Sequence, residues 1–303
     1  MGIDFADLNQ DGYPDLLVSN IADSFSFMES HFAFFSTGQI EQMMQGIAPY
    51  YDASDQIGLA RSSWGWDIKA ADFNNDGLLE VVQTTGFIKG HRDVWPQLQE
   101  FSLINDELTT NPGFWFSMQA GDDISGHVNN PFFVQDNNGY YHDLAEDLGI
   151  GQPFLSRGIA VADVDGDGDL DFAYANLWED SFFFRNDSPG PGSFLGLRLL
   201  LPVEQATGLQ IYPGHAVVAG FPAVGASARV ELADGRSWVA QVDGGNGHGG
   251  KRSGNLHFGL GEVREDEPVK VWLAWRDRQG RTQKQTVELK PGWHTLVLGE
   301  QIP

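Results

Sequence analysis

The sequence contains no cysteine, so disulfides, thiol catalysis and cysteine-based zinc or iron–sulfur sites are excluded. It also has few basic residues, because 18 Lys and Arg stand against 42 Asp and Glu and give a net charge of −24. A protein that binds nucleic acid without regard to sequence needs a basic surface, and anionic membranes attract basic segments. The composition therefore argues against binding of nucleic acid and against docking on anionic lipid.

Long apolar runs are also missing. The longest, residues 194–203, contains Arg198 and Pro202 and is too short to span a bilayer, so direct membrane insertion is not expected. The first seven residues have neither the basic nor the apolar segment of a secretory leader. The mature chain is then either cytoplasmic or preceded by a leader that lies outside this sequence.

The abundant residues indicate an all-β protein. Hydrophobic residues make up 41% and aromatic residues 12% of the 303 positions, which is enough for one large or two ordinary hydrophobic cores. The 37 Gly and 14 Pro together exceed the average share of about 12%. This surplus indicates many turns, and apolar residues at helical spacing are scarce.

A nine-residue acidic pattern occurs three times. Positions 1 and 5 are Asp, position 3 is Asn or Asp, position 6 is Gly, and position 9 is Asp or Glu. The copies, named loop 1, loop 2 and loop 3, are residues 7–15, 72–80 and 163–171. Each lies between an alternating apolar stretch and a strand-like run, so the repeating unit is predicted to be strand, acidic loop, strand.

These loops have the chemistry of a calcium site. Side-chain oxygens at positions 1, 3, 5 and 9 and a backbone carbonyl at position 7 can surround one hard cation, and Gly at position 6 permits the sharp turn. A shell of about six to eight oxygens suits Ca²⁺ better than Mg²⁺, which resists dehydration. The candidate metal ligands are Asp7, Asn9, Asp11, Tyr13, Asp15, Asp72, Asn74, Asp76, Leu78, Glu80, Asp163, Asp165, Asp167, Asp169 and Asp171.

An EF-hand and a set of ordinary turns fit the pattern less well. An EF-hand joins two helices and needs a bidentate Glu at position 12, where this chain has Val18, Gln83 and Tyr174. Asp, Asn and Gly also form turns, but turns alone would not repeat the same residue types in one register three times. Loop 3 has five carboxylates and should bind best, whereas loop 2 ends in Glu80 and binds weakly or through water.

Further elements are predicted between the loops. Residues 131–144 form a hairpin with an Asn-Gly turn, and residues 181–186 form another strand. Residues 39–47 and 142–148 are each predicted to form a short helix.

The uneven spacing of the loops predicts insertions. A propeller blade needs only about 40–50 residues, so insertions are expected at about 23–60 and 88–130. Both carry aromatic and Met side chains, which either pack on the blades or form a surface for a partner.

A segment rich in Pro and Gly, residues 186–193, marks a domain boundary. It divides the chain into residues 1–192, which hold the acidic loops, and residues 193–303, where Lys and Arg are more common. The second part has the short alternating strands of a small β-sandwich. These strands are predicted at 224–232, 238–242, 256–261, 269–275, 285–289 and 294–298.

These features resemble two known families. The acidic loops resemble the FG-GAP/VCBS repeats of β-propellers, and the second part resembles the ASPIC/UnbV domain that follows such repeats in proteins similar to cartilage acidic protein 1. The segments that carry the resemblance are residues 1–7, 12–20, 156–163, 185–186, 224–230 and 257–261. The resemblance implies a secreted or cell-surface calcium-binding protein, usually without known catalysis.

The chain departs from this family in blade number. The family propeller has about seven blades and a closed propeller needs about four to eight, whereas this chain has acidic loops for three. The predicted fold is therefore all-β: a partial, about three-bladed β-propeller with calcium-binding hairpin loops, followed by a small β-sandwich-like domain. Either the chain is the C-terminal part of a longer protein, or a partner covers the open strand edge.

Three further motifs carry little weight. Residues 245–251 match most of a phosphate-binding loop, but Arg252 replaces the required hydroxyl and a strand follows, so a flexible loop is the simpler interpretation. His248 and His257 flank this loop and make a weak case for a metal. Asn186 fits a glycosylation acceptor, although Pro189 follows its serine.

Two functions fit these features. The first is a calcium-binding scaffold, adhesion or assembly module outside the cell, at the cell surface or in the periplasm, where such modules bind calcium at about 10⁻⁴–10⁻³ M. It is non-catalytic and binds a protein or glycan partner, within a larger complex or by self-assembly that completes the propeller. The alternative is an enzyme, or an accessory subunit of a biosynthetic or glycan-active enzyme, which requires a polar pocket at the propeller axis.

Overall fold

The computed structural model describes residues 1–22, 29–103, 110–115, 117–245 and 248–300. These residues form an all-β protein, which confirms the predicted fold class. They include two short α-helices, α1 (Ser54–Ile57) and α2 (Trp95–Ser102), and two 3-10 helices, Ile40–Gln45 and Pro112–Phe114. None of the helices in this described part is long and apolar enough to cross a membrane.

Three sheets come from the residues before the predicted boundary, apart from one strand of the third, and each acidic loop connects two neighbouring strands of one sheet. The first sheet has the order β1 (Ile3–Ala6), β2 (Asp15–Val18), β4 (Phe32–Ser36) and β5 (Tyr50–Asp52). The second has the order β11 (Tyr141–Asp143), β10 (Phe132–Gln135), β7 (Glu80–Thr85), β6 (Ser63–Ala71) and β3 (Ile21–Ala22). The third has the order β14 (Phe182–Phe184), β13 (Asp171–Asn176), β12 (Ser156–Ala162) and β20 (Lys251–Arg252). A two-stranded ribbon pairs β8 (Arg92–Asp93) with β9 (Asp122–Asp123).

The remaining two sheets come from the C-terminal residues and face each other across one core. One has the order β16 (Leu209–Pro213), β24 (Gly292–Leu298), β15 (Ser193–Pro202) and β17 (Gly220–Pro222), with β21 (Leu256–Gly261) also paired to β15. The other has the order β19 (Ser237–Gln241), β18 (Ser227–Glu231), β22 (Val269–Arg276) and β23 (Thr282–Leu289). Inward residues such as Leu197, Leu296, Val230 and Val271 share one hydrophobic cluster. We name these two sheets the C-terminal sheets.

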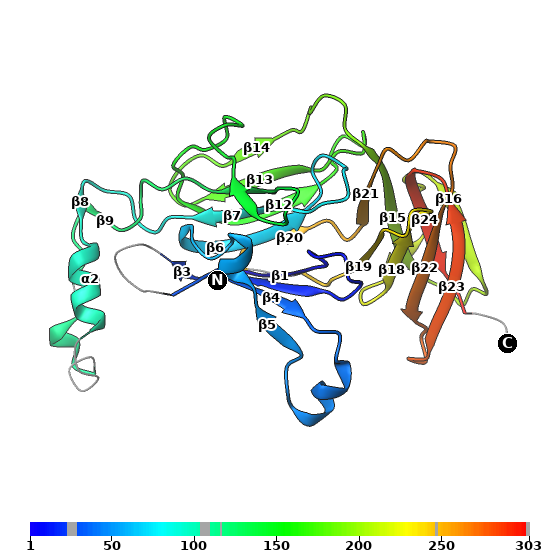
Figure 1. Ribbon diagram of the computed structural model, residues 1–303, viewed down its shortest axis with the longest axis horizontal. Helices are drawn as coiled ribbons and strands as arrows, with labels where there is room; N and C mark the ends of the chain where they lie inside the picture. Colours follow the sequence, from blue (N-terminus) through cyan, green and yellow to red (C-terminus); the bar gives the residue numbers. More distant parts are fainter. Residues whose placement is uncertain (23–28, 104–109, 116, 246–247, 301–303) are drawn as a thin grey trace.

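The sheets lie in a propeller-like arrangement, with the C-terminal sheets against one side of the first three (Figure 1). Successive residues of a strand point to opposite faces of the sheet. Both faces of β7 pack against neighbouring sheets. Val81 packs into the cluster shared with the first sheet, and Val82 packs into the cluster shared with the third. The centre of the second sheet is therefore packed on both faces, and all six residues of β7 are buried, the polar ones included. The number of three blades and the role of their loops stay predictions.

The segment interpreted as a flexible loop is in part a strand. Lys251 and Arg252 form β20, which pairs in parallel with β12, while residues 246–247 lie outside the described residues. Arg252 forms an ion pair with the buried Asp4 of β1 and donates to the Ala70 carbonyl of β6. No helix follows β20 in this described region, so the geometry of a phosphate-binding loop is not formed. The C-terminal region thus inserts a strand among the inner strands of the first three sheets.

Gly250 is required where this segment meets β12. A Cβ placed there would lie 2.0 Å from the Ile159 carbonyl oxygen and 2.0 Å from the Asp67 carboxylate. Gly250→Ala is therefore expected to lower the free energy of unfolding by about 1–3 kcal/mol or more. The measurement is urea unfolding, with Gly254→Ala as control, because a Cβ at Gly254 meets nothing within 4 Å. Equal stability of the two variants would contradict the packing argument.

Of the predicted hairpin and two predicted short helices, the hairpin and one helix are confirmed and the other helix is wrong. The hairpin at 131–144 is present, with β10 antiparallel to β11 and a left-handed Gly139 in the turn. A 3-10 helix stands at Ile40–Gln45, where a short helix is predicted. The helix predicted at 142–148 is wrong, because Tyr141 is buried and its strand pairs with β10, leaving only turns after Asp143.

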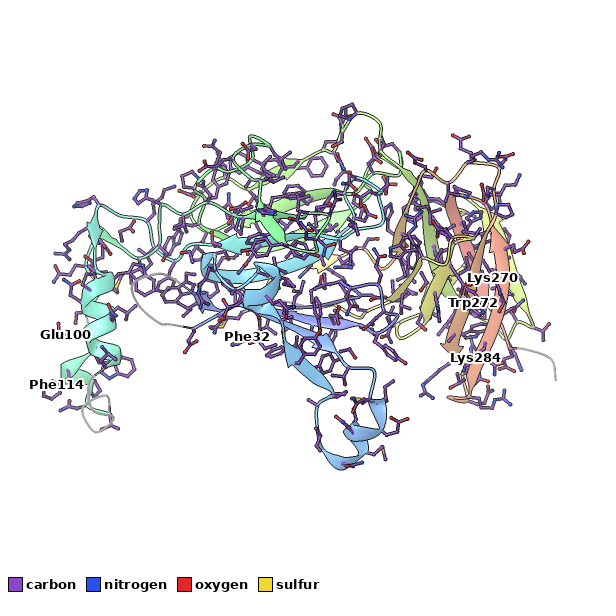
Figure 2. The ribbon with its side chains drawn as sticks, in the orientation of Figure 1. Phe32, Glu100, Phe114, Lys270, Trp272 and Lys284 are labelled. Atoms are coloured by element: carbon purple, nitrogen blue, oxygen red, sulfur yellow. The ribbon has the colours of Figure 1, made fainter. Side chains whose placement is uncertain are left out.

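Two projections extend from the sheets (Figure 1). One carries the 3-10 helix between β4 and β5, with Met43 and Met44 exposed. The other carries α2 and the 3-10 helix Pro112–Phe114, where Phe114 is exposed (Figure 2). In contrast, Trp95 at the start of α2 is buried. Phe116, also counted among the aromatic residues of this region, lies outside the described residues.

Candidate functional site

The three acidic loops adopt one backbone conformation. The residue at position 6 is left-handed in each, with φ of +87° at Gly12, +92° at Gly77 and +100° at Gly168. Position 4 is also left-handed, at Gln10 (φ 59°), Asn75 (φ 61°) and Gly166 (φ 82°). Gly adopts this region at low cost and Asn less readily, so residue type favours the turn at five of these six positions, Gln10 being the exception.

The loops also share one network of four hydrogen bonds. The carboxylate at position 1 accepts from the N–H of position 6, and the oxygen at position 3 accepts from the N–H of position 5. The carboxylate at position 5 accepts from the N–H of position 7, and that at position 9 accepts from the N–H of position 2. In loop 1 the acceptors are Asp7, Asn9, Asp11 and Asp15. In loop 2 they are Asp72, Asn74, Asp76 and Glu80, and in loop 3 they are Asp163, Asp165, Asp167 and Asp171.

Burial divides the predicted ligands into two groups. Asp7, Asp15, Asp72, Glu80 and Asp171 at positions 1 and 9 are buried, and Asp163 is half-buried. The acidic side chains at position 5 are exposed in all three loops. Of the position 7 residues, which are predicted to supply a backbone carbonyl, Tyr13 is exposed, Leu78 is half-buried and Asp169 is buried.

Burial of these carboxylates disfavours their charged form. Desolvation raises the pKa of Asp7 to about 7 and that of Asp72 to about 7. It raises the pKa of Glu80 to about 8, against about 4.3 for an unstructured peptide, and the charge of Asp72 adds to this shift. The pKa of Asp15 and that of Asp169 rise to about 6 for the same reason. Without a compensating cation, each loop therefore holds carboxylates that resist ionisation.

Two details of the loops point to a cation. In loop 3, carboxylate oxygens of Asp163, Asp165 and Asp171 lie within 4.8 Å of one another. In loop 2, the Oδ1 atom of Asp72 is buried and has no hydrogen-bond partner, although the side chain is only 3% exposed. A buried carboxylate oxygen without a partner is costly, and a divalent cation would satisfy it.

Neighbouring loops are tied through equivalent positions. The Gln10 amide at position 4 of loop 1 donates to the carbonyl of Gly77, position 6 of loop 2, at 2.9 Å. The Asn75 amide at position 4 of loop 2 donates in the same way to the Gly168 carbonyl of loop 3 (3.3 Å) and to the Asp169 carboxylate (2.9 Å). The loops therefore form a continuous row along one side of the blades.

Sequence reasoning missed the C-terminal residues that contact this row. The indole N–H of Trp238 donates to the Gly77 carbonyl at 2.6 Å, and that of Trp293 donates to Asp163 Oδ2 at 2.7 Å. The Nε2 atom of His257 lies 2.9 Å from the Gly168 carbonyl and therefore carries the proton. These partners are 89 to 161 residues apart, so no local motif could have indicated them.

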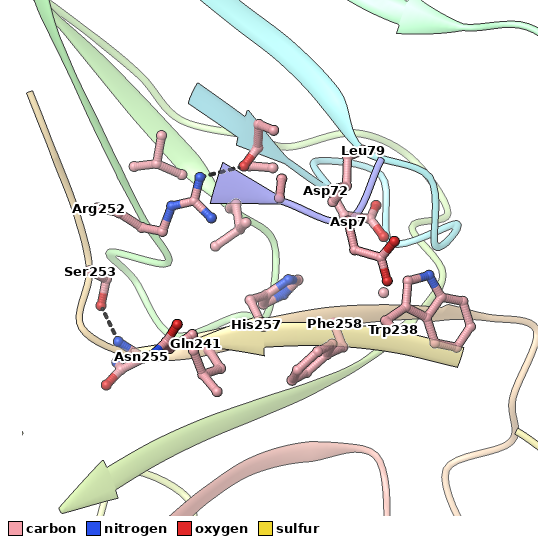
Figure 3. Close-up of a pocket in the computed structure, with 18 of the residues that line it drawn as sticks. Asp7, Asp72, Leu79, Trp238, Gln241, Arg252, Ser253, Asn255, His257 and Phe258 are labelled. Carbon is pink, nitrogen blue, oxygen red and sulfur yellow. Dashed lines mark hydrogen bonds between the residues drawn. The ribbon is translucent and has the colours of Figure 1, made fainter. Parts of the chain in front are cut away.

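A cavity of about 100 Å³ lies between the loops and the C-terminal sheets. Figure 3 shows Asp7, Asp72 and Trp238 at one end, Arg252 at the other, and His257 between them. Burial lowers the pKa of His257 to about 4, so the ring is neutral at pH 7, and its Nδ1 has no hydrogen-bond partner.

Asn186, the residue that fits a glycosylation acceptor, makes hydrogen bonds within the protein. The Asn186 side-chain amide donates to the carbonyls of Phe73 and Leu170, which belong to loops 2 and 3. The Asn186 backbone N–H donates to Asp171. This residue therefore joins two acidic loops, and a glycan on its amide would break these contacts.

The C-terminal sheets also carry the similarity to known proteins. Residues 220–302 match the model of the ASPIC and UnbV family. The ASPIC/UnbV resemblance of the second part is thereby confirmed, and this region supplies Trp238, His257 and Trp293. No curated protein matches the chain. The resemblance of the acidic loops to FG-GAP/VCBS repeats, and of the chain to cartilage acidic protein 1, stays a prediction.

Proposed function

We propose that the protein is a calcium-binding scaffold in which loops 1, 2 and 3 each hold one Ca²⁺. The observation that carries this proposal is the shared hydrogen-bond network, in which the side chains at positions 1, 3, 5 and 9 accept from the same backbone positions in loops that are 65 and 91 residues apart. The buried, unpartnered Oδ1 of Asp72 and the raised pKa values support it. A bound cation would compensate the charge of the carboxylates buried at matching positions.

The donor set favours calcium over other cations. All predicted ligands are oxygens, and a chain without cysteine supplies no thiolate for a softer metal. Calcium tolerates the irregular, flexible coordination that a nine-residue loop provides, whereas Mg²⁺ requires near-ideal octahedral geometry. The role of calcium here is to neutralise clustered carboxylates and to stiffen each hairpin.

We further propose that the first three sheets are blades of a partial propeller and that the scaffold is non-catalytic. The cavity between the loops and the C-terminal sheets, of about 100 Å³, is below the range of about 300–1,000 Å³ for ligand pockets, so this part of the molecule offers little room for a substrate. The exposed apolar tips of the two projections, with Met44 and Phe114, support contact with a protein or glycan partner. Calcium affinity near 10⁻⁴–10⁻³ M would suit a location outside the cell or in the periplasm.

The test is native mass spectrometry of the full chain in millimolar calcium and after chelation. Three ions per chain are expected, and Asp72→Asn and Asp163→Asn should each remove one. Asp55→Asn is the matched control, because Asp55 is exposed on α1 outside the loops. A folded chain that binds no calcium would refute the proposal, and a multimer in the same sample would show self-assembly.

A further inference from the structure

The C-terminal sheets and the residue just before them hold loop 2 at three points of its backbone. The N–H of Gly192 donates to the Asn74 carbonyl at 3.0 Å, and the N–H of Gly261 donates to the Asn75 carbonyl at 2.8 Å. Trp238, which is buried, donates to the Gly77 carbonyl at 2.6 Å. The next residue after Gly77 is the position 7 residue, whose carbonyl is a proposed ligand. The indole therefore fixes the peptide unit that precedes this carbonyl.

The same sheets hold loop 3 at a ligand side chain. The Trp293 indole donates to Asp163 Oδ2, which also accepts from the N–H of Gly168. Phe194 packs closely on Gly168, because a Cβ there would lie 1.9 Å from its ring. The rings of Phe194 and His257 stack at 5.4 Å, and Phe194 and Trp293 meet edge to face at 5.9 Å. This aromatic group orients the position 1 carboxylate of loop 3.

Loop 1 differs from the other two. Among the described residues, its hydrogen bonds to other segments go to the first three sheets and to loop 2, through Ser36, Tyr50 and Gly77. None of them reaches the C-terminal sheets in this described set. The molecule therefore contains two loops held by the C-terminal sheets and one loop of the same conformation that serves as an internal comparison.

We propose that Trp238 and Trp293 are positioning residues for the cations of loops 2 and 3, so that the C-terminal sheets determine the affinity of these two sites. The proposal rests on the proposed calcium function, and the unpartnered Asp72 Oδ1 is the independent sign of a ligand in loop 2. A hydrogen-bond donor that orients a ligand group reduces the freedom lost when the metal binds. Such outer partners typically contribute roughly 10- to 100-fold to metal affinity.

The experiment is calcium titration of the full chain by isothermal calorimetry, with Trp238→Phe and Trp293→Phe. Each variant keeps an aromatic ring and loses the N–H donor. Each is expected to weaken one of three sites by roughly 10- to 100-fold. Trp272→Phe is the control, because Trp272 lies half-buried on β22, away from the loops (Figure 2). Trp293→Phe should have no further effect once Asp163→Asn has removed the third site.

Thermal unfolding separates positioning from a purely structural role. A positioning residue lowers the rise in Tm that calcium produces, whereas a structural residue lowers Tm equally with calcium and with chelator. The proposal is overturned if both variants keep three sites of unchanged affinity, or if Trp272→Phe weakens a site equally. If Asp72→Asn and Asp163→Asn also leave the stoichiometry unchanged, the calcium function itself is wrong. Should Trp238→Phe fail to fold, Trp293→Phe alone decides the question.

Discussion

Removal of calcium is expected to lower the Tm of the protein by roughly 10 °C. A ligand at about 100 times its Kd stabilises the folded state by about 2.7 kcal/mol per site, so three sites give about 8 kcal/mol. The unfolding entropy of a chain of 303 residues converts this free energy into a shift of roughly 10 °C. The measurement is differential scanning calorimetry in about 10 mM calcium and in chelator, with magnesium at equal concentration as control.

The calcium-free protein should also respond to pH in an unusual direction. Burial raises the pKa of Asp7 and Asp72 to about 7 and that of Glu80 to about 8, above their values in the unfolded chain. The folded chain then holds protons that the unfolded chain releases, so stability falls as pH rises from about 4 to about 8. Calcium should abolish this fall. Equal Tm values in calcium and chelator across this range would contradict both the stabilisation and its cause.

Lys69→Met is expected to lower the free energy of unfolding by about 3–5 kcal/mol. Lys69 and Asp67 form an ion pair at 2.7 Å in β6, and both side chains are fully buried. Asp67 also accepts hydrogen bonds from the backbone N–H groups of Ile68 and Ile159, so it ties β6 to β12. Removal of the lysine leaves the aspartate buried without its counter-charge, and an unpaired buried charge is costly. Urea unfolding in saturating calcium measures the loss.

The double variant Asp67→Asn with Lys69→Met tests the cause. Ile68 and Ile159 donate to different oxygens of Asp67, so an asparagine can accept only one of these two backbone hydrogen bonds. No charge remains at the pair, however, so part of the lost stability should return. Arg264→Met is the surface control, because Arg264 pairs with exposed Asp266 and such pairs contribute only about 0–1 kcal/mol. A loss as small as that of the surface control would show that the buried pair does not hold the inner strands together.

The geometry of the acidic loops was predictable because it is local. Left-handed backbone at position 6 follows from its glycine, and the carboxylates accept from N–H groups within their own nine residues. The strands were predictable for the same reason, since the alternation of buried and exposed residues along β18 and β22 follows the alternation of apolar and polar residues in the sequence. The wrong helix at 142–148 shows the limit, because its first residues, His142 and Asp143, belong to β11 and pair with β10 in the hairpin.

Residue order was sufficient for the all-β class, the three acidic loops and the strands of the C-terminal region, since each depends on neighbours along the chain. Packing in three dimensions set the insertion of β20 beside β12, the contacts of Trp238 and Trp293 with loops 2 and 3, and the neutralisation of Asp67 by Lys69 in the interior. The spacing of residue types does not encode which indole donates to which loop, because these partners are distant in the chain. The loops can therefore be recognised from the sequence. The contacts of the C-terminal sheets, which are proposed to control two of these loops, can be recognised only from the tertiary structure.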